Sequence, residues 1–241
     1  MAKTQQVPSD ILDFLRRTDT CSVSNAIETL NVRMRNEGYV HGGLRCMFPE
    51  LAPIAGYAVT ASIRASAPPI SGLCYYQHPD WWRFCASVPG PKIIVMEDLD
   101  PVPGTGALVG EIHAEIGRAL GCVGYLTNGT VRDVGALQAL GFQCFASGPS
   151  VSHSYAHIIE FGAPVHIGGL KISTGDLLHG DLNGIHAIPA AVTGRLPGAV
   201  EKMRAHESEL IELCRDRDFS IEKLEDALRD SSKWNPRPEF H

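Results

Sequence analysis

An arginine and an aspartate stand side by side after an apolar run, where they could hold an anion and a cation together. Residues 122–126 are largely apolar and an Asn-Gly pair follows shortly after, which predicts a buried strand that stops at a turn. Arg132 and Asp133 come directly after that turn. Arginine can clamp a carboxylate through two parallel N–H bonds, and aspartate is a hard oxygen ligand for a divalent metal. A structural alternative stays open, in which Asp133 caps a helix over residues 134–140 and Arg132 is solvated.

Apolar runs alternate with amphipathic segments around this pair and predict a central β-α-β-α-β unit with parallel strands. The expected strands cover residues 92–97, 122–127 and 142–146, and the expected helices cover residues 107–120 and 134–140. Ligands of such sheets collect at the carboxyl ends of the strands. The loop after Glu97 and the turn before Arg132 both lie at that edge, so we expect them to converge.

The helix expected over residues 107–120 begins after glycines, so its first N–H groups are free to face an anion. Glu111 lies about one turn into it, 21 positions before Arg132. An amide-lined pocket with one guanidinium and two carboxylates suits a small 2-oxo acid held together with a divalent metal. Few protein ligands and several retained waters would indicate Mg²⁺ or Mn²⁺ rather than zinc. The buried stripe expected on this helix is Leu108, Ile112, Ile116, Ala119 and Leu120.

Elements on both sides of this unit must position it. The N-terminal half predicts a helix over residues 10–17 capped by Ser9, a helix from Ser22 or Ser24 to Leu30, a strand or hairpin over 54–64 and a helix from about residue 78. The C-terminal half predicts antiparallel strands within 163–172 and 176–189, with a turn at Asn183 and Gly184, then a helical tail over 200–228 and an extended end over 234–241.

Composition limits the classes of protein to consider. The chain has 241 residues, which suits one domain, with a core of about residues 20–190 and a helical tail of about 198–241. The net charge is -6 without a Lys/Arg run, so a nucleic-acid partner is not expected. Seven scattered cysteines without a C-x-x-C pair indicate a reducing cytoplasm. No apolar run approaches ~18 residues, so we expect no membrane contact and a cytoplasmic protein.

A fixed spacing joins two short signatures in this chain: Gly110 and Glu111, then twenty residues, then Arg132 and Asp133. Within its β-α-β context this pattern resembles the RraA-like family, and the resemblance extends from about residue 20 to residue 189. Enzymatic members are class II 4-hydroxy-4-methyl-2-oxoglutarate/4-carboxy-4-hydroxy-2-oxoadipate aldolases, which also decarboxylate oxaloacetate. The resemblance implies an α/β fold, a single compact RraA-like swivelling β/β/α domain with a C-terminal helical tail, assembled into homotrimers or homohexamers with active sites between subunits.

The resemblance also implies a role for each site residue. Asp133 would coordinate Mg²⁺ or Mn²⁺ directly, Glu111 would hold metal-bound waters, and Arg132 would bind the pyruvyl carboxylate and steady the enolate. A neighbouring subunit would contribute an acidic residue, for which Glu207 is the first choice and Glu209 the second. The other expected substrate contacts lie at one helix start, at Gly110, Ile112 and His113.

Three positions depart from the family pattern. The family's aldolases have Asp at the place of Glu111 and Gly at the place of Ala107, and many members have Asp at the place of Asn25. Glu keeps the charge but reaches one methylene further, and a misplacement of about an ångström can cost ~100-fold in rate or mark a different substrate.

The expected function is a divalent-metal-dependent C–C lyase acting on 2-oxo acids through a pyruvate enolate. The reaction is retro-aldol cleavage of 4-hydroxy-2-oxo diacids, oxaloacetate decarboxylation, or both. One alternative is a non-catalytic RraA-type regulator that binds a ribonuclease, and another is a related metal-dependent enzyme with a different oxo-acid substrate. Residues 104–110 imitate a dinucleotide fingerprint, but the spacing is one residue too long and no acid follows for a ribose. His153 and His157 could share a helical face, although no third metal ligand accompanies them.

Overall fold

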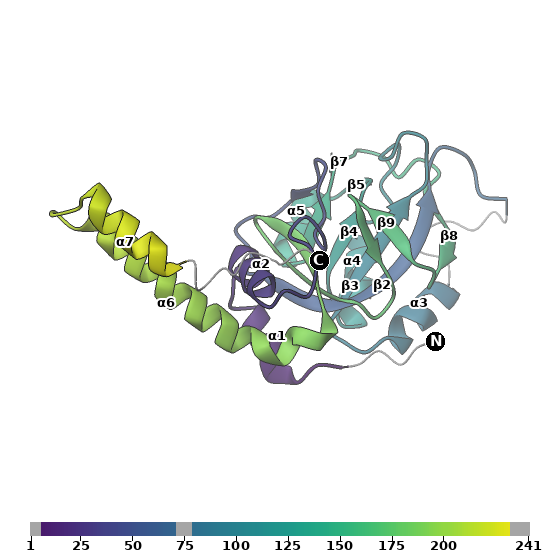
Figure 1. Ribbon diagram of the computed structural model, residues 1–241. Helices are drawn as coiled ribbons and strands as arrows, with labels where there is room; N and C mark the ends of the chain where they lie inside the picture. Colours follow the sequence, from purple (N-terminus) through teal and green to yellow (C-terminus); the bar gives the residue numbers. More distant parts are fainter. Residues whose placement is uncertain (1–5, 71–78, 232–241) are drawn as a thin grey trace.

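Four apolar runs form the parallel centre of a mixed eight-stranded sheet (Figure 1). The computed structural model describes residues 6–70 and 79–231, and within them the strand order is β1-β6-β4-β3-β2-β11-β12, with β8 also paired to β2. The parallel strands are β2 (Ile54–Arg64), β3 (Lys92–Asp98), β4 (Cys122–Thr127) and β6 (Gln143–Ala146). The antiparallel strands at the margins are β1 (Arg45–Cys46), β8 (His157–Phe161), β11 (Leu177–Asp181) and β12 (Gly184–Ile188).

Helices and a hairpin cover the two faces of this sheet. Ile94 and Met96 of β3 pack in the large apolar cluster with the helices, whereas Ile93 and Val95 pack in a second cluster with the hairpin. Burial on both faces explains why the parallel strands are continuous apolar runs. The covering elements are α3 (Pro79–Ser87), α4 (Glu111–Ala119) and α5 (Val134–Ala139) on one side, and the hairpin of β9 (Val165–Ile167) and β10 (Leu170–Ile172) on the other. The predicted α/β fold with its β-α-β-α-β unit is confirmed.

The two N-terminal helices begin at other residues than predicted. Pro8 is the N-cap of α1 (Ser9–Leu15), so the prediction of a Ser9 cap is wrong. α2 (Thr20–Thr29) begins before Ser22 because Asp19 is its N-cap and accepts a hydrogen bond from the Ser22 amide at 2.7 Å. The predicted start at Ser22 or Ser24 is therefore wrong as well.

The predicted antiparallel strands within 163–172 and 176–189 are confirmed, but the turn lies one residue earlier than expected. Leu182 and Asn183 form the two-residue loop, and Gly184 already pairs with Asp181. Gly184 has φ 131°, a conformation that favours glycine. The shared helical face for His153 and His157 is wrong, because His157 belongs to β8 and His153 lies outside any helix.

The charged tail is a helical hairpin and not one helix. A 3₁₀ segment (Ala190–Arg195) leads into α6 (Leu196–Arg215), and α7 (Ile221–Ser231) folds back along it, so that the pair extends from the body as an arm (Figure 1). The Ser220 hydroxyl accepts a hydrogen bond from the Lys223 amide at 3.3 Å and caps α7, which explains why a second helix begins after residue 220. The extended end predicted over 234–241 lies outside the described residues, as does His78.

The helices and the cysteines both bear on the cytoplasmic environment expected from the sequence. No helix in the described ranges is long and apolar enough to cross a bilayer. The six cysteines found in those ranges are free thiols.

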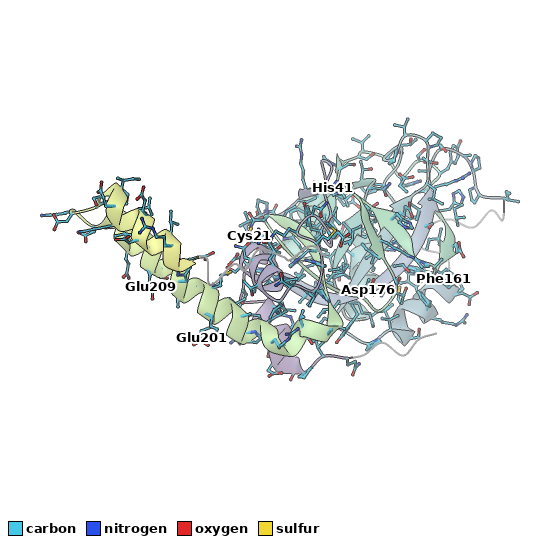
Figure 2. All side chains as sticks on the ribbon, in the orientation of Figure 1. Cys21, His41, Phe161, Asp176, Glu201 and Glu209 are labelled. Carbon is cyan, nitrogen blue, oxygen red and sulfur yellow. The ribbon has the colours of Figure 1, made fainter. Side chains whose placement is uncertain are left out.

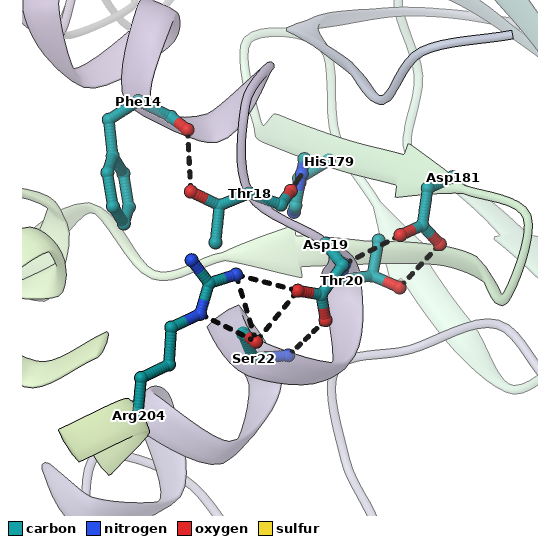
Figure 3. A network of polar contacts seen from close by, with 8 residues as sticks. All are labelled: Phe14, Thr18, Asp19, Thr20, Ser22, His179, Asp181 and Arg204. Carbon is teal, nitrogen blue, oxygen red and sulfur yellow. Dashed lines mark hydrogen bonds and ion pairs between the residues drawn. The ribbon is translucent and has the colours of Figure 1, made fainter. Parts of the chain in front are cut away.

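The arm is joined to the body at the start of α2 (Figure 3). Arg204 of α6 donates to the Asp19 carboxylate at 2.8 Å, and both side chains are about half exposed. Behind them, the buried carboxylate of Asp181 accepts the Thr20 amide at 2.8 Å and the Thr20 hydroxyl at 2.7 Å. The same carboxylate accepts the Asn183 amide at 2.8 Å, so one side chain holds the helix start and the β11–β12 turn together.

Replacing Asp181 should destabilise the protein far more than breaking the exposed ion pair in front of it. Asp181→Ala leaves two amides and a hydroxyl without acceptors, so we expect a loss of about 3 kcal/mol in the free energy of unfolding. Arg204→Ala removes an exposed pair and should cost less than about 1 kcal/mol. Urea denaturation of both variants measures the difference, and equal losses would contradict this account of the α2 start.

Candidate active site at the start of helix α4

The loop after β3 and the turn after β4 meet at the carboxyl edge of the sheet, as the sequence predicted. Arg132 donates its amide to the Val109 carbonyl at 3.0 Å. Earlier in the same segments, the Thr130 hydroxyl donates to the Gly104 carbonyl at 3.4 Å. Two short strands, β5 (Thr130–Val131) and β7 (Gly148–Pro149), pair beside this junction.

Helix α4 begins at Glu111, four residues later than predicted. Residues 107–109 are fully buried, and the Ala107 amide donates to the Ser152 carbonyl at 3.0 Å, so this stretch packs as non-helical chain. The buried face of α4 is formed by His113, Ala114 and Gly117. The predicted stripe is therefore wrong for the helix, and Ile112 is 56% exposed.

Arg132, Asp133 and Glu111 come together at this helix start. The Glu111 amide donates to Asp133 Oδ2 at 3.1 Å, and Arg132 Nε lies 3.4 Å from Asp133 Oδ1. Asp133 is the N-cap of α5 but makes no side-chain capping bond, because its carboxylate turns to α4. Its backbone is left-handed, with φ 54° and ψ 40°, which few non-glycine residues adopt outside functional sites and turns. The purely structural alternative of a capping Asp133 is thus not what the geometry shows.

Gly110 permits this close approach. A Cβ at this position would lie 2.3 Å from Asp133 Oδ2 and 2.9 Å from Arg132 Cγ. Any larger side chain would have to displace the carboxylate or the guanidinium stem. Glycine is therefore required here by space and not by its own φ, which is −137°.

Backbone amides contribute to the same place. The first hydrogen bond within α4 runs from the Ala114 amide to the Gly110 carbonyl, so the amides of Ile112 and His113 have no acceptor inside the helix. The Glu111 amide already donates to the Asp133 carboxylate. The prediction that the first N–H groups of the helix are free is therefore wrong for this amide. Two amides at the positive end of a helix, beside a guanidinium, suit a carboxylate ligand.

In the part of the chain that the structure describes, the acidic side chains do not by themselves form a metal-binding cluster. Within residues 6–70 and 79–231, no group of three or more His, Cys, Asp or Glu side chains is arranged to hold a metal. The Asp133 side chain is 38% exposed, and Glu111 is exposed. Glu207 and Glu209 lie on α6, whose main packing partners are α2, the 3₁₀ segment and α7. Figure 2 labels Glu209 on this helix. Their predicted role in a neighbouring subunit stays a prediction.

A buried histidine lies directly behind the site. His113 is 1% exposed, its ring centroid lies 4.6 Å from that of Trp82, and neither ring nitrogen has a hydrogen-bond partner among the described residues. Burial lowers the pKa of His113 to about 3, so the ring is neutral at physiological pH. Trp82 thus packs against His113 on the buried face of α4, while Trp81 is fully buried in the core.

Replacing His113 should make the protein less sensitive to acid. In the unfolded chain the His113 side chain binds a proton with a pKa near 6.5, whereas in the folded protein its pKa is about 3. Protonation therefore favours the unfolded state, and wild-type stability falls as pH drops below 6.5. His113→Leu removes this term, and its stability advantage should widen by about 1.4 kcal/mol per pH unit below 6.5. Urea denaturation at pH 7.5, 6 and 5 measures the gap, and a constant gap would contradict the buried neutral imidazole.

Comparison with protein families gives one match to most of the chain. Residues 20–186 match the RraA-like family model, which is described as Aldolase/RraA. A protein of Halalkalibacterium halodurans named "Putative 4-hydroxy-4-methyl-2-oxoglutarate aldolase" is 34% identical over 102 residues, covering 42% of this chain and 47% of the relative. A protein of the same name from Ectopseudomonas mendocina is 36% identical over 115 residues, covering 42% of this chain and 70% of the relative. The chain therefore spans about half the length of the first of these relatives.

Solved structures share the fold at low sequence identity. A protein from Pseudomonas syringae pv. tomato superposes with a TM-score of 0.73 at 19% identity, covering 95% of this chain and 98% of that one. Streptomyces coelicolor RraAS2, described as an unusual member of the RNase ES inhibitor RraA protein family, superposes with a TM-score of 0.65 at 18% identity. That match covers 88% of this chain and 99% of RraAS2. At these identities the likeness concerns the fold alone.

Proposed function

Because residues 20–186 match its model, this chain belongs to the RraA-like family, and from that membership we propose that it is a divalent-metal-dependent C–C lyase acting on small 2-oxo acids. The observation that carries the proposal is the left-handed Asp133, whose carboxylate lies between the Glu111 amide and the Arg132 side chain. Residues held in sparsely populated backbone conformations cluster at active sites and ligand clamps, so the left-handed Asp133 supports a functional role. The two relatives named as aldolases support the same reaction class.

Arg132 would clamp the carboxylate of the 2-oxo acid. Its side chain is 28% exposed, and its Nε lies 3.4 Å from the Asp133 carboxylate, which puts a positive charge beside the start of α4. The amides of Ile112 and His113 would complete the anion site from the opposite side. This arrangement supports a carboxylate substrate, since a planar carboxylate matches a guanidinium fork and paired amides.

The residues fit a hard divalent ion. Asp133 would be its direct protein ligand, and Glu111 would contribute a second carboxylate through water, so all the donors are oxygens. The described residues supply too few ligands for a zinc site, whereas Mg²⁺ and Mn²⁺ commonly retain several waters. When bound, such an ion would act as a Lewis acid on the 2-oxo group.

Arg132 and Glu111 would then determine which C–C bond of the substrate can break. With its carboxylate held by Arg132, the substrate would place its 2-oxo carbon at the start of α4, the helix that begins with Glu111. Retro-aldol cleavage of a 4-hydroxy-2-oxo diacid and decarboxylation of oxaloacetate both leave charge beside the 2-oxo group. Glu111 would hold the water that returns a proton to that carbon. We propose both reactions as activities of one site.

A second copy of this chain would complete the site. Of the 20 residues in α6 only Leu196 and Val200 are buried, and Ile112 is exposed next to Glu111. A helical hairpin with so little buried surface gains most of its stability from packing on another body. We propose a homotrimer or homohexamer in which the arm brings Glu207, or Glu209 close behind it, to a neighbouring site.

Metal removal and substitution of Asp133 or Arg132 should abolish turnover. With Mn²⁺ or Mg²⁺, purified protein should release pyruvate from oxaloacetate and from 4-hydroxy-4-methyl-2-oxoglutarate, and EDTA should stop both reactions. Asp133→Ala should lose at least about 1,000-fold in kcat/KM, and Arg132→Lys about 100-fold, because lysine lacks the bidentate fork. A coupled pyruvate assay measures all of these, and turnover that survives EDTA or Asp133→Ala would refute the proposal.

A matched pair of glycine variants tests the crowding at the helix start. Gly110→Ala forces a Cβ into the Asp133 carboxylate, so kcat should fall by about 100-fold for a displacement of the order of an ångström. A Cβ at Gly135, in the first turn of α5, meets nothing within 4 Å, so Gly135→Ala should keep its activity. If both variants retain wild-type kcat, the packing of Gly110 against Asp133 has no catalytic importance.

The alternative function is a regulator that binds a ribonuclease, and it rests on the fold shared with RraAS2. The acidic and basic set at Glu111, Arg132 and Asp133 favours the enzyme, because it could hold a carboxylate and a divalent cation together. Metal-loaded protein that cleaves neither oxo acid but inhibits a ribonuclease in a cleavage assay would establish the alternative.

A further inference from the structure

The side chain of Asn128 continues the pairing of two strands beyond their last backbone contact. The β3–β4 ladder ends with Met96 opposite Thr127. One residue further, Asn128 Oδ1 accepts the Asp98 amide at 2.7 Å, and Asn128 Nδ2 donates to the Asp98 carbonyl at 2.9 Å. Both main-chain groups of Asp98 are thus held by one amide side chain, in the manner of a strand neighbour.

Asp98 in turn organises the loop that follows it. Its carboxylate is buried and accepts the Asp100 amide at 3.0 Å and the Gly104 amide at 2.7 Å. A Cβ at Gly129, the neighbour of Asn128, would lie 3.0 Å from Asp98 Oδ2, so glycine permits this approach. Asp100 is anchored separately, because its carboxylate accepts the Ala65 amide at 2.8 Å from the end of β2.

The contacts continue from this point to the candidate site. The Gly104 carbonyl accepts a hydrogen bond from the Thr130 hydroxyl, and the Val109 carbonyl accepts one from the Arg132 amide. The Glu111 amide donates to the Asp133 carboxylate. Residues 98–111 and 128–133 are therefore joined at four successive places, and the first of these is the pair of Asn128 hydrogen bonds. A shift of Asp98 relative to Asn128 would therefore alter the distance between Glu111 and Asp133.

We propose that Asn128 is a positioning residue, which fixes the distance between the segment that presents Gly110 and Glu111 and the turn that presents Arg132 and Asp133. The inference rests on the proposed function, since it assigns Asn128 a role in that reaction. Asn128 is half-buried and needs no contact with the substrate. The amide is suited to this task because it donates and accepts at once, which neither a carboxylate nor an apolar side chain can do.

The experiment compares Asn128→Ala and Asn128→Asp with Asn183→Ala in the full-length protein. Asn128→Ala loses both bonds, and Asn128→Asp keeps an acceptor for the Asp98 amide but places a carboxylate oxygen against the Asp98 carbonyl. Asn183 is exposed in the β11–β12 turn and is held through its main-chain amide, so its substitution is the matched control. For each variant we would measure kcat and KM with oxaloacetate, Mn²⁺ binding by electron paramagnetic resonance, and the midpoint of urea unfolding.

A positioning role and a merely structural role move different quantities. Positioning predicts that kcat per bound Mn²⁺ falls about 30- to 100-fold in Asn128→Ala and about tenfold in Asn128→Asp, while KM and the Mn²⁺ Kd stay within about threefold. A structural role would lower the unfolding midpoint and the number of Mn²⁺ sites, but would leave kcat per site unchanged. Asn183→Ala should match wild type throughout.

The outcomes separate this inference from the proposed function. If wild-type protein turns over oxaloacetate and kcat per Mn²⁺ site in Asn128→Ala stays within about threefold of it, the positioning role is refuted and the lyase stands. If Asn128→Ala does not fold, Asn128→Asp decides by the same criterion. Wild-type protein that binds Mn²⁺ but cleaves neither oxo acid refutes the proposed function, and the role of Asn128 in it falls as well.

Discussion

Parallel pairing of β3 with β4 is the constraint on which the candidate site depends. The register that sets Met96 opposite Thr127 brings the two chain segments after these strands to the same edge. The chain leaves β3 at this edge, so the start of α4 lies here, and the helix then returns the chain to the opposite edge for the parallel strand β4. Gly110 and Arg132, more than twenty positions apart, become neighbours only because the strands are adjacent and aligned. A shift of register by two residues would separate them.

Close packing at this edge also explains the strained backbone of Asp133. A left-handed aspartate costs roughly 1 kcal/mol, and such strain persists only where surrounding contacts hold it. The Arg132 amide is fixed by Val109, and the Asp133 carbonyl accepts the Leu137 amide at 3.0 Å. The backbone is thus held on both sides, and the carboxylate is directed to α4 instead of capping α5. Gly110 is the complement of this conformation, because only a residue without Cβ leaves room for it.

Local patterns predicted those parts of the fold that local forces determine. The parallel strands were predicted to within a residue or so because burial on both faces requires continuous apolar runs. The start of α2 is capped locally by Asp19, which the sequence prediction overlooked, whereas the hold of Asp181 on Thr20, 161 positions away, has no local signal. The start of α4 was misplaced because a buried, non-helical apolar stretch over 107–109 resembles a helical turn in sequence. Asn128 was visible as a strand terminator, but its pairing with the Asp98 main chain follows from strand adjacency alone.

Charge at the helix start links the metal proposal to the assembly proposal. Glu111 and Asp133 bring two carboxylates to the start of α4, where Asp133 pairs with Arg132, and the amide end of α4 contributes only about half a positive charge. Water compensates the remainder while both carboxylates are exposed. A neighbouring subunit that covered them would remove this water, and a further glutamate would add negative charge, so burial would be unfavourable without a cation. A divalent ion satisfies this requirement, and subunit closure and metal binding should therefore favour each other.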